Sequence, residues 1–306
     1  MIKTVSLIGM GALGILYGDM LTHALGTECV SFLADSGRVE KYRTSGIFCN
    51  GRKCDFTVKN SAEPNAPSDL LIFAVKGTTL GSAIETARGH IGPDTVILSL
   101  LNGISSEEII AEAFGKEHMI YCVAQGMDAL RIGNRLEYQH AGELRIGLPK
   151  ELSANAPRLK AVEELFSRTG VPFKSETDII HRMWSKWMLN VGVNQVVMTE
   201  CGSFGTVQCE GPARERMKNA MREVVALSQA EGTGLTEKDL AEYVALIDTL
   251  NPEGMPSMRQ DGLAGRKTEV DLFSGTVIRR AKKFGLPVPV NQELYDTVLR
   301  METALT

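Results

Sequence analysis

The sequence has no excess of basic residues and no long apolar run. Its 306 residues include 33 lysines and arginines against 37 aspartates and glutamates, a formal net charge of −4. Without a basic excess or a block of basic residues, the electrostatic field of the protein does not favour nucleic acid. No apolar segment approaches membrane-spanning length, and the N-terminus lacks the apolar run of a secretory signal. We therefore expect a cytoplasmic protein that binds neither nucleic acid nor membrane.

The cysteines follow no metal-binding or catalytic pattern. None lies in a Cys-x-x-Cys pair, and no histidine lies at metal-ligand spacing. In a reducing compartment such cysteines are usually free thiols that behave as small apolar side chains. The sequence therefore predicts no metal site. The six cysteines are Cys29, Cys49, Cys54, Cys122, Cys201 and Cys209.

The first half of the chain alternates short apolar runs with segments of helical pattern. This alternation predicts an α/β domain, residues 1–177, with a doubly wound parallel sheet and helices on both faces. Residues 50–60 and 134–147 look like antiparallel additions, because short alternating segments there flank Asn50-Gly51 and Gly133-Asn134. The strand candidates are Thr4–Ile8, Cys29–Leu33, Leu70–Val75, Val96–Leu100, Met119–Val123 and Gly170–Lys174.

The second half, residues 178–306, predicts an all-helical domain, because strand patterns disappear from Asp178 onward. Several helix ends are legible. Pro212 is typical of a first helical position, and Thr236 with Asp239 has capping-box spacing. Gly232, Gly285 and the pair Pro287 and Pro289 are interpreted as stops. The helix candidates are 178–199, 212–231, 237–250, 258–284 and 291–304.

A glycine-rich turn directly follows the first predicted strand. Its residues are Gly9, Met10, Gly11, Ala12, Leu13 and Gly14, and a helix follows. This strand–turn–helix context is what the dinucleotide-binding fingerprint requires. Gly9 would permit the tight turn, Gly11 the close approach of a pyrophosphate, and Gly14 the packing of helix on strand. Phosphates would then lie against backbone N–H groups at the positive end of the helix.

The end of the second predicted strand bears on the choice of cofactor. Asp35 lies about where a ribose-binding acid is expected, and a carboxylate there favours NAD(H) because it repels a 2′-phosphate. Ser36, Arg38 and Lys41 follow directly, and a serine with cations suits the 2′-phosphate of NADP(H). The residues leave this choice open.

Two further residues lie where predicted strands end, at the edge where open α/β sheets bind ligands. Lys76 could contact a cofactor phosphate, and Asn102, in Asn102-Gly103, could contact the nicotinamide end. The alternatives are a solvated lysine and an ordinary Asn-Gly turn.

Lys186, Asn190 and Asn194 form a polar stripe on an otherwise apolar helix, because their spacing places them on one face. Leaving such groups buried without partners would cost on the order of 2 kcal/mol or more each. A ketone reductase can use this stripe: an ammonium can stabilise the developing oxyanion and deliver a proton, and amides can orient the substrate. The alternative is a helix whose polar face pairs with other protein groups.

A final segment runs from Ser257 to Asp271. Ser257 with Gln260 has capping-box spacing, so Ser257 could be a helix N-cap or, at a cleft, a ligand donor. Glu269 could be a surface acid on a helix or an ion-pair partner of Lys186. The residues alone do not decide between these roles.

Taken together, these motifs resemble the ketopantoate reductase family. The resemblance covers essentially the whole chain and is most specific in Pro256–Asp261, Gly265–Asp271 and the Trp184-Ser185-Lys186 segment with its two asparagines. It implies a Rossmann domain followed by a helical domain, as in the 6-phosphogluconate dehydrogenase superfamily. It also implies NADPH-dependent reduction of 2-dehydropantoate to (R)-pantoate, in pantothenate and coenzyme A synthesis.

The resemblance also assigns roles. It implies that Lys186 is the general acid, that Asn190, Asn194 and Ser257 hold the substrate, and that Lys76, Asn102 and Glu269 contact the cofactor. The sequence departs from the family pattern in three places. Asp35 stands where arginine is common, Gln195 stands where a proline or small apolar residue is common, and Phe204 stands where a polar residue is common.

These departures leave two alternatives, reduction of another branched 2-oxo acid and a redox sensor that binds NAD(P) without catalysis. The sensor is disfavoured because it needs only the glycine turn, whereas the chain also has Lys186, Asn190, Asn194, Ser257 and Glu269. Whether the protein is a monomer or a homodimer is left open.

Overall fold

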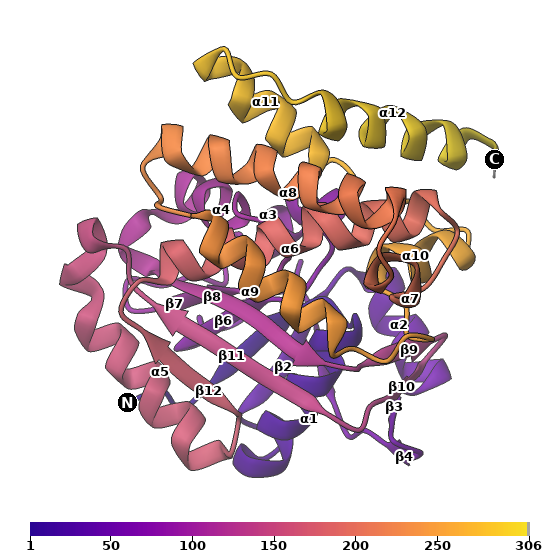
Figure 1. Cartoon of the computed structure of the whole chain (residues 1–306). Helices are drawn as coiled ribbons and strands as arrows, with labels where there is room; N and C mark the ends of the chain where they lie inside the picture. The colour runs from indigo at the N-terminus through magenta and orange to yellow at the C-terminus, as the bar shows by residue number, and fades with distance from the viewer. Residues whose placement is uncertain (305–306) are drawn as a thin grey trace. The chain divides into compact units, whose positions relative to one another are not determined.

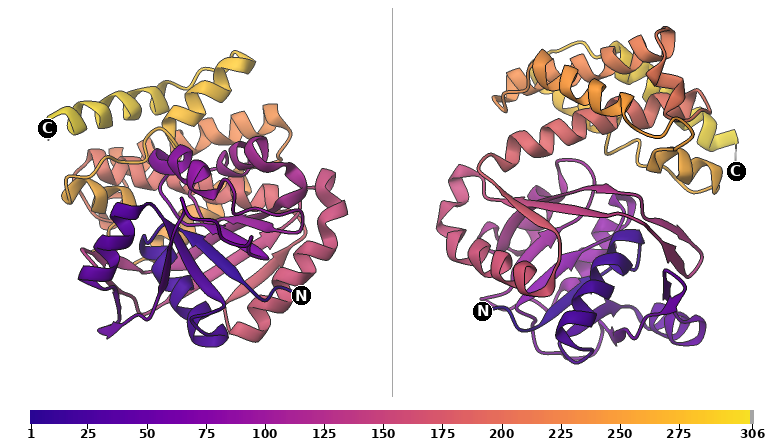
Figure 2. Two further views of the ribbon diagram at one scale, coloured as in Figure 1. Left: turned by 180° about the vertical axis from the view of Figure 1, so that it is seen from behind. Right: turned by 60° about the horizontal axis from the view of Figure 1, so that its bottom comes forward.

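A computed structural model describes residues 1–304 (Figure 1) and divides the chain into two compact units, Met1–Ile179 and Ile180–Thr306. The first unit is an α/β structure. In the second, the described residues form helices and turns and contain no strand (Figures 1 and 2). The predicted fold class, a parallel α/β sheet followed by an all-helical domain, is confirmed.

The first unit is built on an eight-stranded sheet in the order β12-β11-β8-β7-β6-β1-β2-β5. Neighbouring strands are parallel, except that β11 runs antiparallel to β8. The strands are β1 (Val5–Ile8), β2 (Val30–Ala34), β5 (Thr57–Asn60), β6 (Leu70–Phe73), β7 (Val96–Ser99), β8 (Met119–Met127), β11 (Ala141–Gly147) and β12 (Phe173–Glu176).

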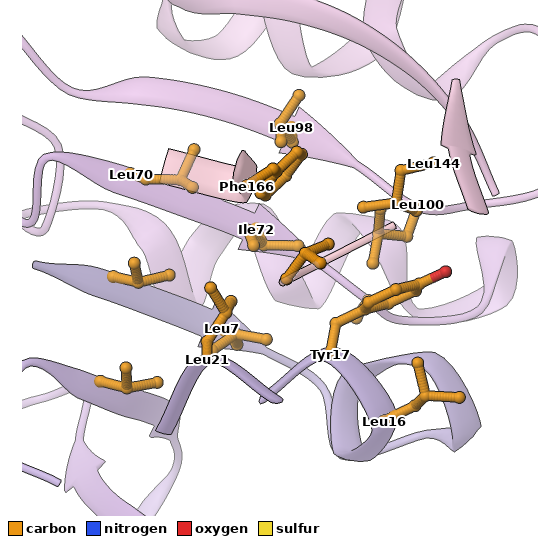
Figure 3. Close-up of a cluster of buried hydrophobic side chains, with 14 of the residues drawn as sticks. Leu7, Leu16, Tyr17, Leu21, Leu70, Ile72, Leu98, Leu100, Leu144 and Phe166 are labelled. Carbon is orange, nitrogen blue, oxygen red and sulfur yellow. The ribbon is translucent and has the colours of Figure 1, made fainter. Parts of the chain in front are cut away.

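Helices cover both faces of this sheet because its central strands are apolar on both sides. Leu7, Ile72 and Leu98 point to the face covered by α1 (Ala12–Leu25) and α5 (Ala156–Thr169), where they join Tyr17, Leu21 and Phe166 in one core (Figure 3). Ile8, Leu71 and Ile97 point to the opposite face, against α3 (Leu80–Ala87) and α4 (Ser106–Phe114). Burying each such side chain stabilises the fold by about 1.5–3 kcal/mol. The remaining helical segments of this unit are α2 (Ser36–Ser45), η1 (Gly77–Thr79), η2 (Lys116–His118) and η3 (Lys150–Asn155).

A smaller four-stranded sheet contains the two predicted hairpins. It has the order β4-β3-β10-β9, and its strands are β3 (Phe48–Cys49), β4 (Arg52–Lys53), β9 (Leu130–Ile132) and β10 (Arg135–Glu137). Asn50 and Gly51 both have positive φ, of 46° and 75°, as a two-residue hairpin turn requires.

The prediction for residues 50–60 was partly wrong. Their last strand, β5, runs parallel to β2 and extends the main sheet. The alternating pattern of residues 57–60 identified a strand correctly, but side-chain alternation is the same for parallel and antiparallel strands and carries no direction.

The helices of the second unit are α6 (Ile179–Thr199), α7 (Gly205–Gln208), α8 (Pro212–Glu231), α9 (Glu237–Asp248), α10 (Ser257–Leu263), α11 (Ser274–Phe284) and α12 (Pro289–Ala304). Of these, α6, α8 and α9 begin within one residue of the predicted helix starts. Pro212 is the first residue of α8, and Thr236 with Asp239 forms the expected capping box. Gly232 and Gly285 end their helices in the left-handed conformation. Pro289, interpreted as a stop, instead begins α12, where its missing N–H costs no helical hydrogen bond.

The single helix predicted for residues 258–284 is wrong. The structure has two helices, α10 and α11, separated by ten residues in turns. Gly265 adopts a left-handed φ of 61°, and Arg266 turns back to Asp261, donating its backbone N–H to the carbonyl oxygen and its Nε to the carboxylate at 2.9 Å. The N–H of Thr268 donates to the Glu302 carboxylate at 2.7 Å. The Asp261 carbonyl oxygen and the Glu302 carboxylate thus accept backbone N–H groups that would otherwise need acceptors within a helix, and so permit the break.

Candidate active site

The glycine turn has the geometry that its spacing predicts. Gly9 has a φ of 100°, and a Cβ there would lie 2.5 Å from the carbonyl oxygen of Ala74 on the neighbouring strand's extension. A Cβ on Gly14 would lie 2.0 Å from the carbonyl oxygen of Gly9. Both contacts are shorter than any side chain tolerates, so the fold itself requires these two glycines.

Gly11 differs from its two neighbours in the motif. It has an ordinary φ of −70°, and a Cβ there would meet protein only at 3.5 Å, from the Ala74 carbonyl oxygen. The protein's own packing therefore does not require glycine at this position. Gly11 is the N-cap of α1 and supplies no side-chain cap to the first N–H groups of the helix, which have no acceptor within the helix. This combination fits a bound pyrophosphate, which needs both the space and the donors.

Asp35 has a structural role that the sequence analysis did not identify. It is the N-cap of α2: its Oδ1 accepts the backbone N–H of Arg38 at 2.8 Å. The Arg38 Nε also lies 3.5 Å from Asp35 Oδ2, and both side chains are more than half exposed. The carboxylate that would favour NAD(H) and the guanidinium that would favour NADP(H) are thus paired with each other.

Lys76 and Asn102 both lie just beyond the carboxyl ends of neighbouring strands, β6 and β7. Lys76 is exposed and precedes η1, whose Thr79 hydroxyl donates to the Lys76 carbonyl at 3.0 Å. Asn102 is half-buried in the turn before α4, next to Gly103, which has a φ of 98°. Because β6 and β7 are adjacent and parallel, these turns follow the same edge of the sheet as the glycine turn.

In the second unit, the two asparagines of the stripe and Ser257 form one network. Asn194 Nδ2 donates to Asn190 Oδ1 at 3.1 Å. Asn194 Oδ1 accepts from the Ser257 hydroxyl at 3.3 Å and from the Met258 N–H at 3.1 Å. Both asparagines are buried, whereas Ser257 is exposed. The structure therefore brings together three of the predicted substrate-binding residues from two helices.

Lys186 begins the stripe two turns before Asn194 on α6. Its side chain is half-buried, between the buried residues Ser185 and Trp187. The Trp187 indole N–H donates to the Leu272 carbonyl at 2.8 Å, which holds this part of α6 to the segment before α11. The stripe is therefore most exposed at Lys186, whereas Asn190 and Asn194 are buried.

The structure excludes one of the alternative roles for each of two residues in the Ser257–Asp271 segment. The N-cap of α10 is Pro256, with ψ of 158°, so Ser257 is the first helical residue and its hydroxyl is used by Asn194. Glu269 is not a surface helix acid: it is 6% exposed and lies in the turns between α10 and α11. Its carbonyl accepts the N–H of Leu272 at 2.9 Å, which closes one of these turns. An ion pair of Glu269 with Lys186 stays a prediction.

The two departures inside this unit have different explanations. Gln195 is fully buried: its Nε2 donates to the Val191 carbonyl, and its Oε1 accepts the N–H of Ser274 at 3.2 Å, at the start of α11. It therefore joins two helices. Phe204 is half-buried, its N–H donates to the Gly254 carbonyl at 2.9 Å, and its ring lies against Gly254 in the loop that leads to Ser257.

Sequence reasoning missed one unusual group in the first unit, the buried carboxyl of Glu107. Burial raises the pKa of this carboxyl to about 7. An acid in the first turn of a helix is ordinary on sequence grounds, because it complements the helix dipole. Only the structure shows that this one is enclosed.

Two kinds of feature are absent from residues 1–304. This part of the chain holds no group of three or more histidine, cysteine or acidic side chains that could bind a metal ion. It also contains no helix that is long and apolar enough to cross a membrane.

Comparison with known families decides the class of the protein. Two family models match the chain, "Ketopantoate reductase PanE/ApbA" over residues 5–151 and "Ketopantoate reductase PanE/ApbA C terminal" over residues 178–302. The chain belongs to the ketopantoate reductase family. It is an NAD(P)-dependent oxidoreductase that acts on a ketone or the corresponding alcohol. The predicted family and class of enzyme are confirmed.

Individual relatives cover nearly the whole chain. The 2-dehydropantoate 2-reductase of Pyrococcus horikoshii is 27% identical, over 97% of each chain. A crystal structure of a PanE/ApbA family ketopantoate reductase from Ralstonia eutropha JMP134 is 25% identical over 99% of each chain, with a TM-score of 0.84. D-mandelate dehydrogenase, in a ternary structure with NADH and anilino(oxo)acetate, has a TM-score of 0.88 over 99% of each chain; at 22% identity it shows likeness of fold alone.

Proposed function

We propose that the protein reduces a 2-oxo acid to the 2-hydroxy acid with NAD(P)H, and that 2-dehydropantoate is the substrate. The network of Asn190, Asn194 and Ser257 beside Lys186 carries this proposal. It brings two amides and a hydroxyl together, and the helical spacing places Lys186 on the same side of α6. These are the groups needed to hold a carboxylate and a ketone. Relatives that match nearly the whole chain are named 2-dehydropantoate 2-reductase. Their name favours (R)-pantoate as the product, and the reaction would then be a step of pantothenate synthesis.

Lys186 is the proposed general acid. When the nicotinamide cofactor is bound, it supplies the hydride that adds to the carbonyl carbon, and negative charge develops on the carbonyl oxygen. An ammonium near that oxygen stabilises the charge and delivers the proton. Asn194 would orient substrate best if its own side chain is fixed, and its bonds to Ser257, Met258 and Asn190 fix it.

The glycine turn, Lys76, Asn102 and Glu269 are the proposed cofactor contacts. The fit at Gly11, where glycine is not required by packing, supports a pyrophosphate over α1. The family resemblance favours NADPH. Asp35 is the observation that favours NADH instead, because its carboxylate is held at the end of β2 by the Arg38 N–H and would repel a 2′-phosphate.

A steady-state assay of 2-dehydropantoate reduction, with NADPH and NADH compared side by side, tests the proposal. A high kcat/KM with 2-dehydropantoate supports the substrate assignment, and the faster cofactor shows what Asp35 does. No turnover with either cofactor would contradict the substrate while leaving the class of enzyme in place.

Reduction of another 2-oxo acid is the second candidate, and Phe204 is the observation that favours it. Its ring lies in the loop region leading to Ser257, where the family often has a polar residue. An apolar ring offers no hydrogen bond to a substrate hydroxyl and favours an apolar side chain. Comparing kcat/KM for 2-dehydropantoate with that for 2-oxo acids bearing branched or aromatic side chains separates the two candidates. Preference for 2-dehydropantoate would contradict the second.

A further inference from the structure

A buried carboxyl lies behind the turn that carries Asn102. Glu107, in the first turn of α4, is 1% exposed. Its Oε2 accepts the Ser106 hydroxyl at 2.9 Å, whereas its Oε1 is buried without a hydrogen-bond partner among the described residues. Half of this polar group is therefore unsatisfied in the interior, which costs the fold free energy.

Three hydrogen bonds connect this carboxyl to the backbone of the turn. The hydroxyls of Ser106 and Ser99 are 2.8 Å apart, and the N–H of Leu101 donates to Ser99 Oγ at 3.3 Å. A carboxylate only accepts, so the direction of the chain is determined. Ser106 donates to Glu107, Ser99 donates to Ser106, and Ser99 accepts from Leu101, the residue directly before Asn102.

The surroundings of Glu107 make this chain sensitive to ionisation. Burial raises the pKa of the Glu107 carboxyl to about 7, and Glu108 on the same helix acts in the same direction. The facing group on β8 is Tyr121, which also lies within the influence of Glu108 and of Glu151 on η3. A hydrogen-bond chain that ends on a charged acceptor is stronger than one that ends on a neutral acid. Such costly, perturbed groups are typical of functional sites.

We propose that Glu107 is a positioning residue: its carboxylate, acting through Ser106 and Ser99, fixes the turn at Leu101 and so holds Asn102 ready for the cofactor. The proposal rests on the proposed function for one step, the contact of Asn102 with the cofactor. The chain of hydrogen bonds itself does not depend on that step. Ionisation of Glu107 would therefore order the turn and tighten cofactor binding.

The first test needs no cofactor. The amide resonance of Leu101 is followed by NMR from pH 5.5 to 8.5 in the wild type, Glu107→Gln and Ser106→Ala. We expect a titration with a midpoint near 7 in the wild type, and its loss in both variants, since Ser106→Ala keeps the carboxyl but interrupts the chain. Glu112→Gln, an exposed acid one turn further along α4, is the matched control and should titrate as the wild type does. A Leu101 amide that titrates equally in Glu107→Gln, or not at all in the wild type, would overturn the proposal.

The second test is the dissociation constant of the preferred reduced cofactor, measured by fluorescence across the same pH range. Relative to Glu107→Gln, the wild type should bind about fivefold more tightly at pH 8 than at pH 6, as expected when a charge-assisted hydrogen bond replaces a neutral one. A constant ratio would overturn the link from Glu107 to the cofactor. Failure of the wild type to bind either NADPH or NADH would instead contradict the proposed function, and the Leu101 titration would still decide the positioning role.

Discussion

The two units carry their proposed binding residues in different ways. In the first, the glycine turn offers backbone groups, and it has no room for a side chain at Gly9 or Gly14, where a Cβ would lie 2.5 Å or less from a backbone oxygen. In the second, Asn194 and Ser257, 63 residues apart, are joined through side-chain hydrogen bonds. A backbone site is sensitive to added atoms, whereas a side-chain site is sensitive to lost ones. The difference predicts opposite responses to alanine substitution.

The largest effect is expected in the second unit, from Lys186→Ala. Removal of a proton donor that acts in the transition state should lower kcat by about 10²–10⁴-fold, with a much smaller change in KM. Steady-state kinetics measure both constants. Lys174→Ala, an exposed lysine on β12, is the matched control and should leave kcat unchanged. Near-normal turnover in Lys186→Ala would remove the proton-donor assignment.

The next largest effect sharpens the comparison, because it comes from the side chain of Glu107 within the unit whose glycine turn offers only backbone groups. Its pKa, raised from 4.5 to about 7, means that the folded state keeps a proton which the unfolded state has lost. The free energy of unfolding should therefore fall by about 3 kcal/mol as the pH rises from 4.5 to 7, and then level off.

Glu107→Gln removes this contribution. The free energy of unfolding of the variant relative to that of the wild type should therefore increase by about 3 kcal/mol between pH 5 and pH 8. Urea unfolding at both pH values measures it. Using the difference between the two proteins cancels the other titrating groups. A difference that is independent of pH would show that Glu107 ionises normally.

Two glycine substitutions test the glycine turn of the first unit directly. Gly14→Ala forces a methyl group to within 2.0 Å of the Gly9 carbonyl oxygen and should lower stability by about 1–3 kcal/mol. Gly11→Ala meets protein only at 3.5 Å, so it should leave stability within about 1 kcal/mol of the wild type and weaken cofactor binding instead. Thermal unfolding and a cofactor titration separate the two effects. Equal cofactor affinity in Gly11→Ala would contradict the pyrophosphate placement.

Much of the fold could be predicted because it depends on local patterns. The strand–turn–helix units around Gly9 and the capping box at Thr236 are each encoded within a few residues. The break between α10 and α11 could not, because its replacement acceptors include Glu302, far along the chain. The parallel pairing of β5 was missed because strand direction depends on the partner.

The candidate site divides in the same way. The spacing of Lys186, Asn190 and Asn194 predicted a shared face, and the structure shows the two asparagines bonded together. The enclosure of Glu107 depends on tertiary surroundings, and nothing in its neighbouring residues signals it. The capping by Asp35 is a local contact with Arg38, and the preference for aspartate at helix N-caps was the signal that could have found it. Sequence therefore identified the chemical groups but not the groups that hold them in place.

The smallest effect concerns Asp35, whose charge and capping role can be separated. Asp35→Ser keeps an N-cap for α2 but removes the carboxylate, so stability should change by less than about 1 kcal/mol. Loss of the repulsion toward a 2′-phosphate should shift the ratio of kcat/KM for NADPH over NADH about tenfold toward NADPH, and Asp35→Arg should shift it further because it adds a phosphate partner. The ratio is measured with both cofactors at one pH and ionic strength, since surface charge effects are screened by salt. An unchanged ratio in both variants would mean that Asp35 serves α2 alone and that the cofactor's ribose is read elsewhere.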